Sequence, residues 1–201
     1  MIKEFSEMIH RNGNMEFKGT IIDIETLWKP RVKGAIKYKT YEIEAYDDQT
    51  IISFGYLTRQ DIDKDLIKLK IYCCENIAEI DQLNEKIKKG IFTLNRPYYA
   101  FQHYFEKYVI KLNCDVNIQF DYELNNTHFE KKENVVKELG IDSFNDPFNG
   151  VGGKCMESFN NGTIDDVIKH NRSCLLKEYE ILTERGCREI RGNYVLRDGD
   201  E

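Results

Sequence analysis

Two carboxylates stand two residues apart inside an apolar stretch, Asp23 and Glu25 of residues 19–26. The β-branched composition of this stretch predicts a buried strand, and side chains two apart on a strand point to the same face. Two buried like charges are costly unless a positive partner lies between them, and carboxylate oxygens suit Mg²⁺ or Mn²⁺. We therefore expect a divalent-metal site here. The alternative is an edge strand with one solvated face, although the three neighbouring isoleucines favour burial.

A basic stretch follows directly, with no acidic residue between Thr26 and Tyr41. Its cations are Lys29, Arg31, Lys33, Lys37 and Lys39. The first three are our candidates for gripping the phosphates of a nucleic acid strand next to the metal. A solvated loop explains the same composition equally well. Trp28, at the start of the stretch, can stack on a base or be buried in the core.

The length, composition, charge and cysteine pattern of the chain limit the kinds of protein that it can be. The 201 residues, 41% hydrophobic and 32% charged, fit one globular domain over 1–201 with a core at about 18–184. The net charge of −6 counts mildly against nonspecific binding of nucleic acid. No apolar run reaches the ~20 residues of a membrane span, and the acidic N-terminus does not resemble a signal peptide. The six cysteines form no Cys-x-x-Cys pair, so we expect reduced thiols in a cytoplasm and no structural zinc site.

Periodicity predicts an α/β protein. Strands are expected at about 18–27, 50–57, 66–74 and 98–101, with a short one around 116–120. Helices are expected at 2–10, 77–89, from 103 onward, 131–139 and 163–185, several of them ended by glycine. Residues 121–130 and the Gly- and Asn-rich residues 142–153 are expected to be irregular.

The first acidic motif, Asp-Ile-Glu-Thr after an apolar strand, resembles the first motif of the DEDD 3′-5′ exonucleases, a branch of the ribonuclease H-like superfamily. The second motif of that family follows the fourth strand with an amide, an aromatic residue and an acid. Gln102 takes the amide position here and Glu106 the acid position. The third motif resembles His-Asn-Arg of residues 170–172, but its metal-binding aspartate falls on Cys174. Glu178, one helical turn later, is a weak substitute.

The resemblance implies a ribonuclease H-like α/β fold, with an antiparallel meander and then parallel strands, flanked by helices. It also implies hydrolysis at the end of single-stranded DNA or RNA with one or two Mg²⁺ or Mn²⁺ ions. The implied metal ligands are Asp23, Glu25, Glu106 and Cys174. His170 would orient the attacking water beside these acids, and Gln102 and Asn171 would contact the nucleic acid.

Cys174 leaves three interpretations open. In the first interpretation the chain is an exonuclease with an altered metal site that uses Mn²⁺ or a single ion, because a thiol is a softer ligand that prefers zinc over Mg²⁺. The chain can instead have lost cleavage and kept nucleic-acid binding. In the third interpretation the acids are structural, Glu106 is an ordinary exposed helix residue, and the protein is an interaction module.

Overall fold

The computed structural model describes residues 1–10, 18–29, 41–59, 66–127 and 130–190. One mixed sheet crosses the molecule, with strand order β1-β4-β3-β2-β5-β6-β7. The strands are β1 (Ile2–His10), β2 (Thr20–Trp28), β3 (Gln49–Arg59), β4 (Leu66–Cys74), β5 (Tyr98–Ala100), β6 (Tyr122–Glu123) and β7 (Arg188–Glu189). The first four are joined by antiparallel ladders, whereas β5 runs parallel to β2 and β6 parallel to β5. The predicted α/β class and mixed sheet are confirmed.

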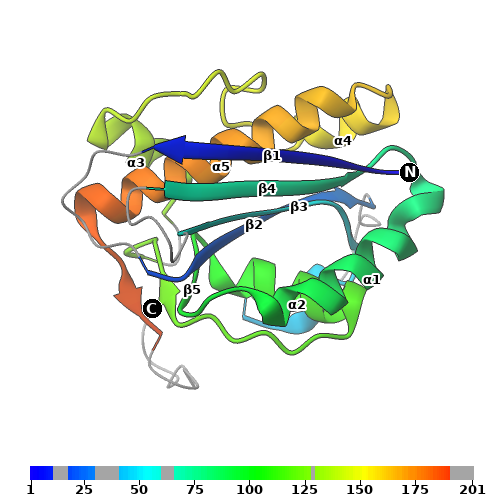
Figure 1. The fold of residues 1–201 in the computed structure, drawn as a ribbon, viewed down its shortest axis with the longest axis horizontal. Helices are drawn as coiled ribbons and strands as arrows, with labels where there is room; N and C mark the ends of the chain where they lie inside the picture. Colours follow the sequence, from blue (N-terminus) through cyan, green and yellow to red (C-terminus); the bar gives the residue numbers. More distant parts are fainter. Residues whose placement is uncertain (11–17, 30–40, 60–65, 128–129, 191–201) are drawn as a thin grey trace, which may run out of the picture.

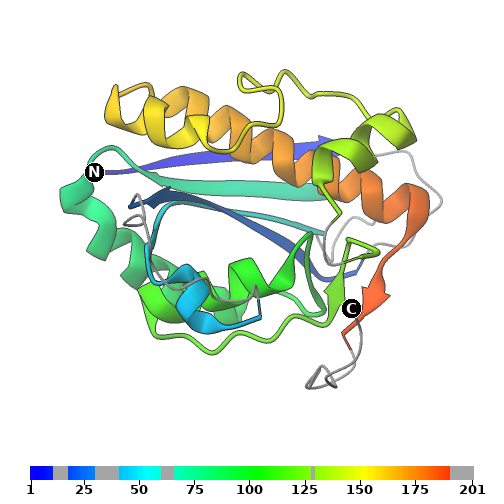
Figure 2. The same ribbon diagram turned by 180° about the vertical axis from the view of Figure 1, so that it is seen from behind.

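The helices cover both faces of the sheet. They are α1 (Ile80–Gly90), α2 (His103–Cys114), α3 (Lys132–Leu139), α4 (Lys154–Asn160) and α5 (Ile164–Arg185), with short 3₁₀ turns η1 (Ile43–Tyr46), η2 (Ile77–Glu79) and η3 (Ile91–Thr93). The long α5 contacts β2, β3 and β4, and α4 packs beside it on the same face (Figure 1). Helices α1 and α2 lie on the opposite face, as the view from behind also shows (Figure 2).

Strand β2 is central because it is apolar and has a neighbour on each side. Ile21 and Ile22 are fully buried, and Ile24 is 4% exposed, which excludes the edge-strand alternative. The β2–β3 ladder shifts register between Glu25 and Thr26. Such an irregularity bends a strand and re-aims its side chains, and here it lies next to the acidic pair.

Glycine at position 55 of β3 lets α5 approach the sheet closely. A Cβ atom there would lie 2.4 Å from Asn171 Oδ1 and 2.8 Å from Leu175 Cδ1. Both contacts are closer than real Cβ atoms show, so a larger residue would force the side chains of Asn171 and Leu175 to move. Gly55 therefore allows α5 to pack directly over the acids of β2.

Four elements differ from the sequence predictions. Residues 2–10 form β1 and not a helix, because they pair along their whole length with β4, and such tertiary pairing overrides a short helical pattern. Residues 116–120 alternate between buried and exposed but form no ladder, and the short strand is β6, inside the expected loop at 121–130. Helix α4 and strand β7 were not predicted. In the described residues no helix is both long and apolar enough to cross a bilayer.

Candidate metal centre

A pocket of about 520 Å³ opens beside the C-terminal half of β2. Five parts of the chain line it: β2, the start of α2, the start of α3, the loop at 150–153 and the middle of α5. The lining residues are Asp23, Ile24, Glu25, Thr26, Trp28, Phe101, Gln102, Phe105, Glu106, Glu130, Lys131, Lys132, Glu133, Gly150, Gly152, Gly153, His170 and Cys174. Segments far apart in sequence therefore meet at one polar cavity, which is the usual form of a small-molecule or catalytic site.

Asp23 is held from two sides. Its Oδ1 lies 3.0 Å from Lys132 Nζ, and its Oδ2 accepts a 2.5 Å hydrogen bond from the amide of Asn171. Ser53 Oγ donates to Asn171 Oδ1 at 3.1 Å, which fixes the orientation of that amide. Lys132 Nζ also pairs with Glu178, whose side chain is fully buried. A lysine ammonium thus stands between two of the acids.

Glu106 and Glu178 each keep one carboxylate oxygen without a partner. Both side chains are buried, and Oε2 of each forms no hydrogen bond with any described residue. Burial raises the pKa of Glu106 well above its usual value, and the charges of Glu178 and Asp23 raise it further. Burial also raises the pKa of Glu178, to about 8, although Lys132 lowers it. We call Asp23, Glu106 and Glu178 the oxygen cluster.

The oxygen cluster contains more negative charge than Lys132 alone neutralises when all three carboxyls are ionised. Burial lowers the pKa of Lys132, but Asp23, Cys174 and Glu178 outweigh it and raise that pKa well above the ordinary lysine value. One ammonium therefore faces three carboxyl groups. The remaining charge requires bound protons or a further cation.

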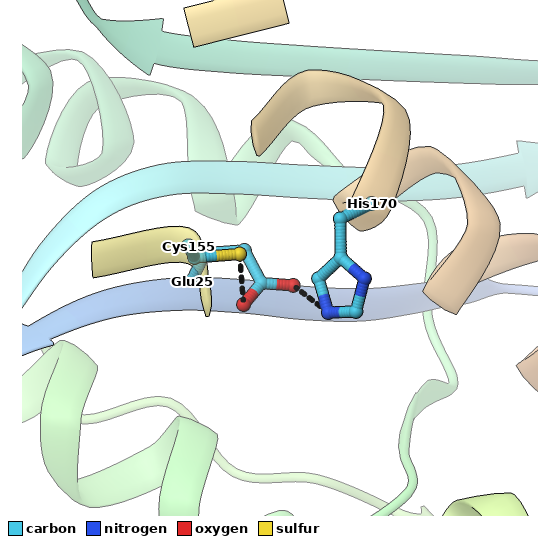
Figure 3. A group of neighbouring side chains, drawn as sticks. All are labelled: Glu25, Cys155 and His170. Carbon is cyan, nitrogen blue, oxygen red and sulfur yellow. Dashed lines mark hydrogen bonds and ion pairs between the residues drawn. The ribbon is translucent and has the colours of Figure 1, made fainter. Parts of the chain in front are cut away.

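Glu25 points to a different set of partners from Asp23. Its Oε2 accepts a 3.3 Å hydrogen bond from Cys155 Sγ of α4, and its Oε1 lies 3.6 Å from His170 Nε2 of α5 (Figure 3). Cys174 Sγ lies 3.7 Å from the same ring nitrogen. Burial raises the pKa of Glu25 to about 7, even though the neighbouring His170 lowers it. We call Glu25, Cys155, His170 and Cys174 the thiol cluster.

A buried carboxylate fixes the ring of His170. Asp146 Oδ1 lies 2.7 Å from His170 Nδ1, and its Oδ2 accepts from Lys177 Nζ at 2.9 Å. Two backbone amides, of Phe148 and Gly150, also donate to Asp146. Burial lowers the pKa of His170, but Cys174 and Asp146 outweigh it and raise that pKa to about 11. With Nδ1 committed to Asp146, Nε2 is the ring nitrogen that remains for Glu25 and Cys174.

Most of the predicted site residues come together. Asp23, Glu25, Glu106, Cys174, His170 and Gln102 all line the pocket. Asn171, expected to contact nucleic acid, is instead fully buried behind Asp23 and orients its carboxylate. Lys29 is exposed at the end of β2 and is not part of the lining, whereas Arg31 and Lys33 lie outside the described residues.

Three side chains of the site were missed in the sequence. Lys132 begins a helix that shows only an ordinary amphipathic pattern, so nothing marks it as the partner of Asp23. Asp146 lies in the Gly- and Asn-rich stretch, and its capping of the following backbone amides was the available signal. Cys155 lies 19 residues before Cys174, a spacing that matches no common metal motif.

Two groups of donor atoms lie close enough to hold a metal ion. The donors of Glu25, Cys155 and His170 lie within 4.8 Å of one another, and so do those of Asp23, Glu25 and Cys174. All of these side chains are buried. Of the expected ligands, Asp23, Glu25 and Cys174 therefore come together in one group, whereas Glu106 belongs to neither group and the identity of the metal stays a prediction. No protein-family model matches this chain, and neither does any curated protein or solved structure in the comparisons made.

Proposed function

We propose that this protein is a divalent-metal-dependent phosphodiester hydrolase, related to the DEDD 3′-5′ exonucleases, that acts on an end of single-stranded DNA or RNA. One observation carries the proposal. The oxygen cluster brings a carboxylate from β2, one from α2 and one from α5 to the same buried place beside an open pocket. Carboxylates in such a site are what metal-assisted phosphoryl transfer needs.

The sheet supports the same proposal at the level of the fold. An antiparallel meander, β2 to β4, precedes β5 and β6, which run parallel to β2. This is the arrangement that the ribonuclease H-like resemblance implies. The acids also come in the implied order, from the first strand of the meander, the helix after β5 and the last long helix. Since one fold hosts many functions, the site carries the argument further than the sheet does.

The donor set fits Mg²⁺ or Mn²⁺. Hard divalent cations prefer carboxylate oxygens, and Oε2 of both Glu106 and Glu178 has no partner among the described residues. Asp23 and Glu25, whose donor atoms lie within 4.8 Å of each other and of Cys174, would hold the ion, with Glu106 and Glu178 near them. Such an ion would lower the pKa of a bound water and stabilise charge on the phosphate.

The remaining pocket residues suit a nucleotide strand. Trp28 is 42% exposed and lines the cavity together with Phe105, so its indole is accessible to stack on a base. Lys131 and Gln102 add a cation and an amide to the lining for contacts with phosphate and sugar. Burial lowers the pKa of His170, but Cys174 and Asp146 raise it to about 11, which favours the protonated imidazole next to Glu25.

A nuclease assay tests the proposal. The substrates are 3′-labelled single-stranded DNA and RNA, each with Mg²⁺, Mn²⁺ or EDTA. We expect metal-dependent shortening from the 3′ end, and a loss of more than about 100-fold in Asp23→Asn, because even outer-shell partners of a metal cost about 10–100-fold. Asp165→Asn is the matched control, since Asp165 lies exposed on α5 and pairs with Lys3 on the surface. Equal activity in the wild type and Asp23→Asn would refute the proposal.

One observation favours a second function, nucleic-acid binding without cleavage. The ammonium of Lys132 already pairs with two of the three acids of the oxygen cluster, and a cysteine stands where the family has an aspartate. If the wild type and Asp23→Asn are equally inert with every ion, but bind single strands with an affinity that falls steeply with salt, this second function holds.

A further inference from the structure

The thiol cluster has a chemistry of its own that the proposed hydrolase does not need. It combines a carboxylate oxygen, an imidazole nitrogen and two sulfurs, drawn from β2, α4 and α5. All four side chains are buried, with exposed fractions of 7% or less. Mg²⁺ has little affinity for sulfur, whereas thiolate and imidazole together suit zinc and similar borderline-soft ions.

Three distances between these atoms fall in the range of tetrahedral coordination. Bonds of about 2.3 Å to sulfur and about 2.0–2.2 Å to nitrogen or oxygen give tetrahedron edges of about 3.3–3.8 Å. The three measured edges are 3.3 Å from Cys155 Sγ to Glu25 Oε2, 3.6 Å from Glu25 Oε1 to His170 Nε2 and 3.7 Å from that nitrogen to Cys174 Sγ. Since the first two distances involve different oxygens of Glu25, the carboxylate would bind an ion here through both oxygens or turn to present one of them.

The support behind His170 is the one that metal-bound histidines usually have. Such a histidine donates its second ring N–H to a carboxylate, which fixes the ring and its tautomer. Asp146 performs this role at 2.7 Å and is itself held by Lys177 and two backbone amides. On the pocket side, a Cβ atom at Gly152 would be in ordinary contact with both donors, 3.8 Å from His170 Nε2 and 3.9 Å from Glu25 Oε2, so glycine leaves them uncovered there.

We propose that the thiol cluster is a binding site for Zn²⁺ or a similar borderline-soft divalent ion, separate from the oxygen cluster. Binding releases three protons to solvent, one from each of the two thiols and one from Nε2 of a protonated imidazole. The two thiolates and the neutral imidazole then coordinate the ion together with the Glu25 carboxylate. The sequence argued against a zinc site because it has no Cys-x-x-Cys pair, but this site takes its ligands from three elements that meet only after folding. The inference does not rest on nuclease activity.

Metal titration of the full chain tests the inference. The protein is stripped with a chelator under reducing conditions and titrated with Zn²⁺, in competition with a chromogenic chelator, or with Co²⁺ as a spectroscopic probe. We expect one Zn²⁺ per chain and, in the Co²⁺ form, thiolate-to-metal charge-transfer absorption. Cys155→Ala removes one of two thiolates and should reduce this absorption by about half, whereas Asp146→Asn should weaken Zn²⁺ binding about 10–100-fold. Cys114→Ala, a buried thiol outside the cluster, is the matched control and should change neither value.

The absence of charge-transfer absorption in the wild type would overturn the inference, and so would identical titrations of Cys155→Ala and Cys114→Ala. X-ray absorption at the zinc edge counts sulfur ligands in the wild-type protein, so the test remains decisive even if a variant fails to fold. Two sulfurs support the site, and none refutes it. Asp23→Asn should keep the Co²⁺ absorption while losing cleavage. The failure of one proposal is therefore distinguishable from the failure of the other.

Discussion

Replacing Lys132 with methionine tests whether its ammonium is the counterion of the oxygen cluster. Methionine keeps most of the side-chain length and removes the charge. In the wild type, Lys132 Nζ lies 3.0 Å from Asp23 Oδ1 and pairs also with Glu178, and the side chains of the two acids are 6% and 0% exposed. The variant leaves both acids buried without their cation.

The expected cost follows from this burial. Removing one partner of a buried ion pair destabilises a protein by about 3–5 kcal/mol. The lower end applies here, because Glu178, with a pKa of about 8, can take up a proton near neutral pH. For a chain of this size, about 3 kcal/mol lowers Tm by about 6–12 °C. Divalent ions that bind only the folded state, at a free concentration of 100 times their Kd, raise the free energy of unfolding by about 2.7 kcal/mol.

The assay is thermal unfolding of the wild type and Lys132→Met, each in EDTA and in excess Mg²⁺. We expect the variant to be less stable in EDTA and to gain more from Mg²⁺ than the wild type, in which the ion must compete with Lys132. Lys169→Met is the control, because the exposed pair of Lys169 with Asp166 is worth about 0–1 kcal/mol. A variant as stable as the wild type in EDTA, or an equal Mg²⁺ shift in both proteins, would refute the counterion argument.

Two further predictions use the same site. Glu25 and Glu178, with pKa values of about 7 and about 8, keep their protons in the folded state at pH values where the unfolded chain has lost them. Stability of the metal-free protein should therefore fall as the pH rises from about 4.5 to about 8, by several kcal/mol, and urea unfolding in EDTA would contradict this with a flat or rising profile. Gly55→Ala should cost about 1–3 kcal/mol and weaken Mg²⁺ binding, because its Cβ would push Asn171 away from Asp23. Gly90→Ala, with no atom within 4 Å of its Cβ, should not be destabilising, and equal unfolding curves for the two variants would count against the close approach of α5.

The central strands and the long helices were predictable because their signals are local. The apolar run of β2 and the stripe of α5 each extend over several residues with one periodicity. Strand β1 was mistaken for a helix because it pairs at the edge of the sheet with β4, and edge pairing leaves no pattern in the strand itself. Helix α4 has only seven residues and a weak signal of its own, and its packing against α5 and β2 supplies what its sequence lacks.

The acids of the candidate site also have a local signal in the sequence, whereas their partners have none. Asp23 and Glu25 stand out because a charge within a buried strand needs a partner. That partner can come from any element that folds over the strand, so neither Lys132 nor Cys155 carries a local mark. The sequence thus predicts that the buried acids need a cation or a proton, and the tertiary structure determines which groups supply it.

Where α5 crosses β2, different side chains of the helix contact the acids of the oxygen cluster and of the thiol cluster. Asp23 and Glu25 share one face of the strand, yet Asn171 meets the first and His170, its neighbour in the helix, meets the second. Successive residues of a helix point about 100° apart, so the rotation of α5 about its axis decides whether an amide or an imidazole lies above each acid. Gly55 permits the close approach of α5, because a Cβ atom there would lie 2.4 Å from Asn171 Oδ1. The rotation and the depth of one helix therefore determine which acid belongs to the oxygen cluster and which to the thiol cluster.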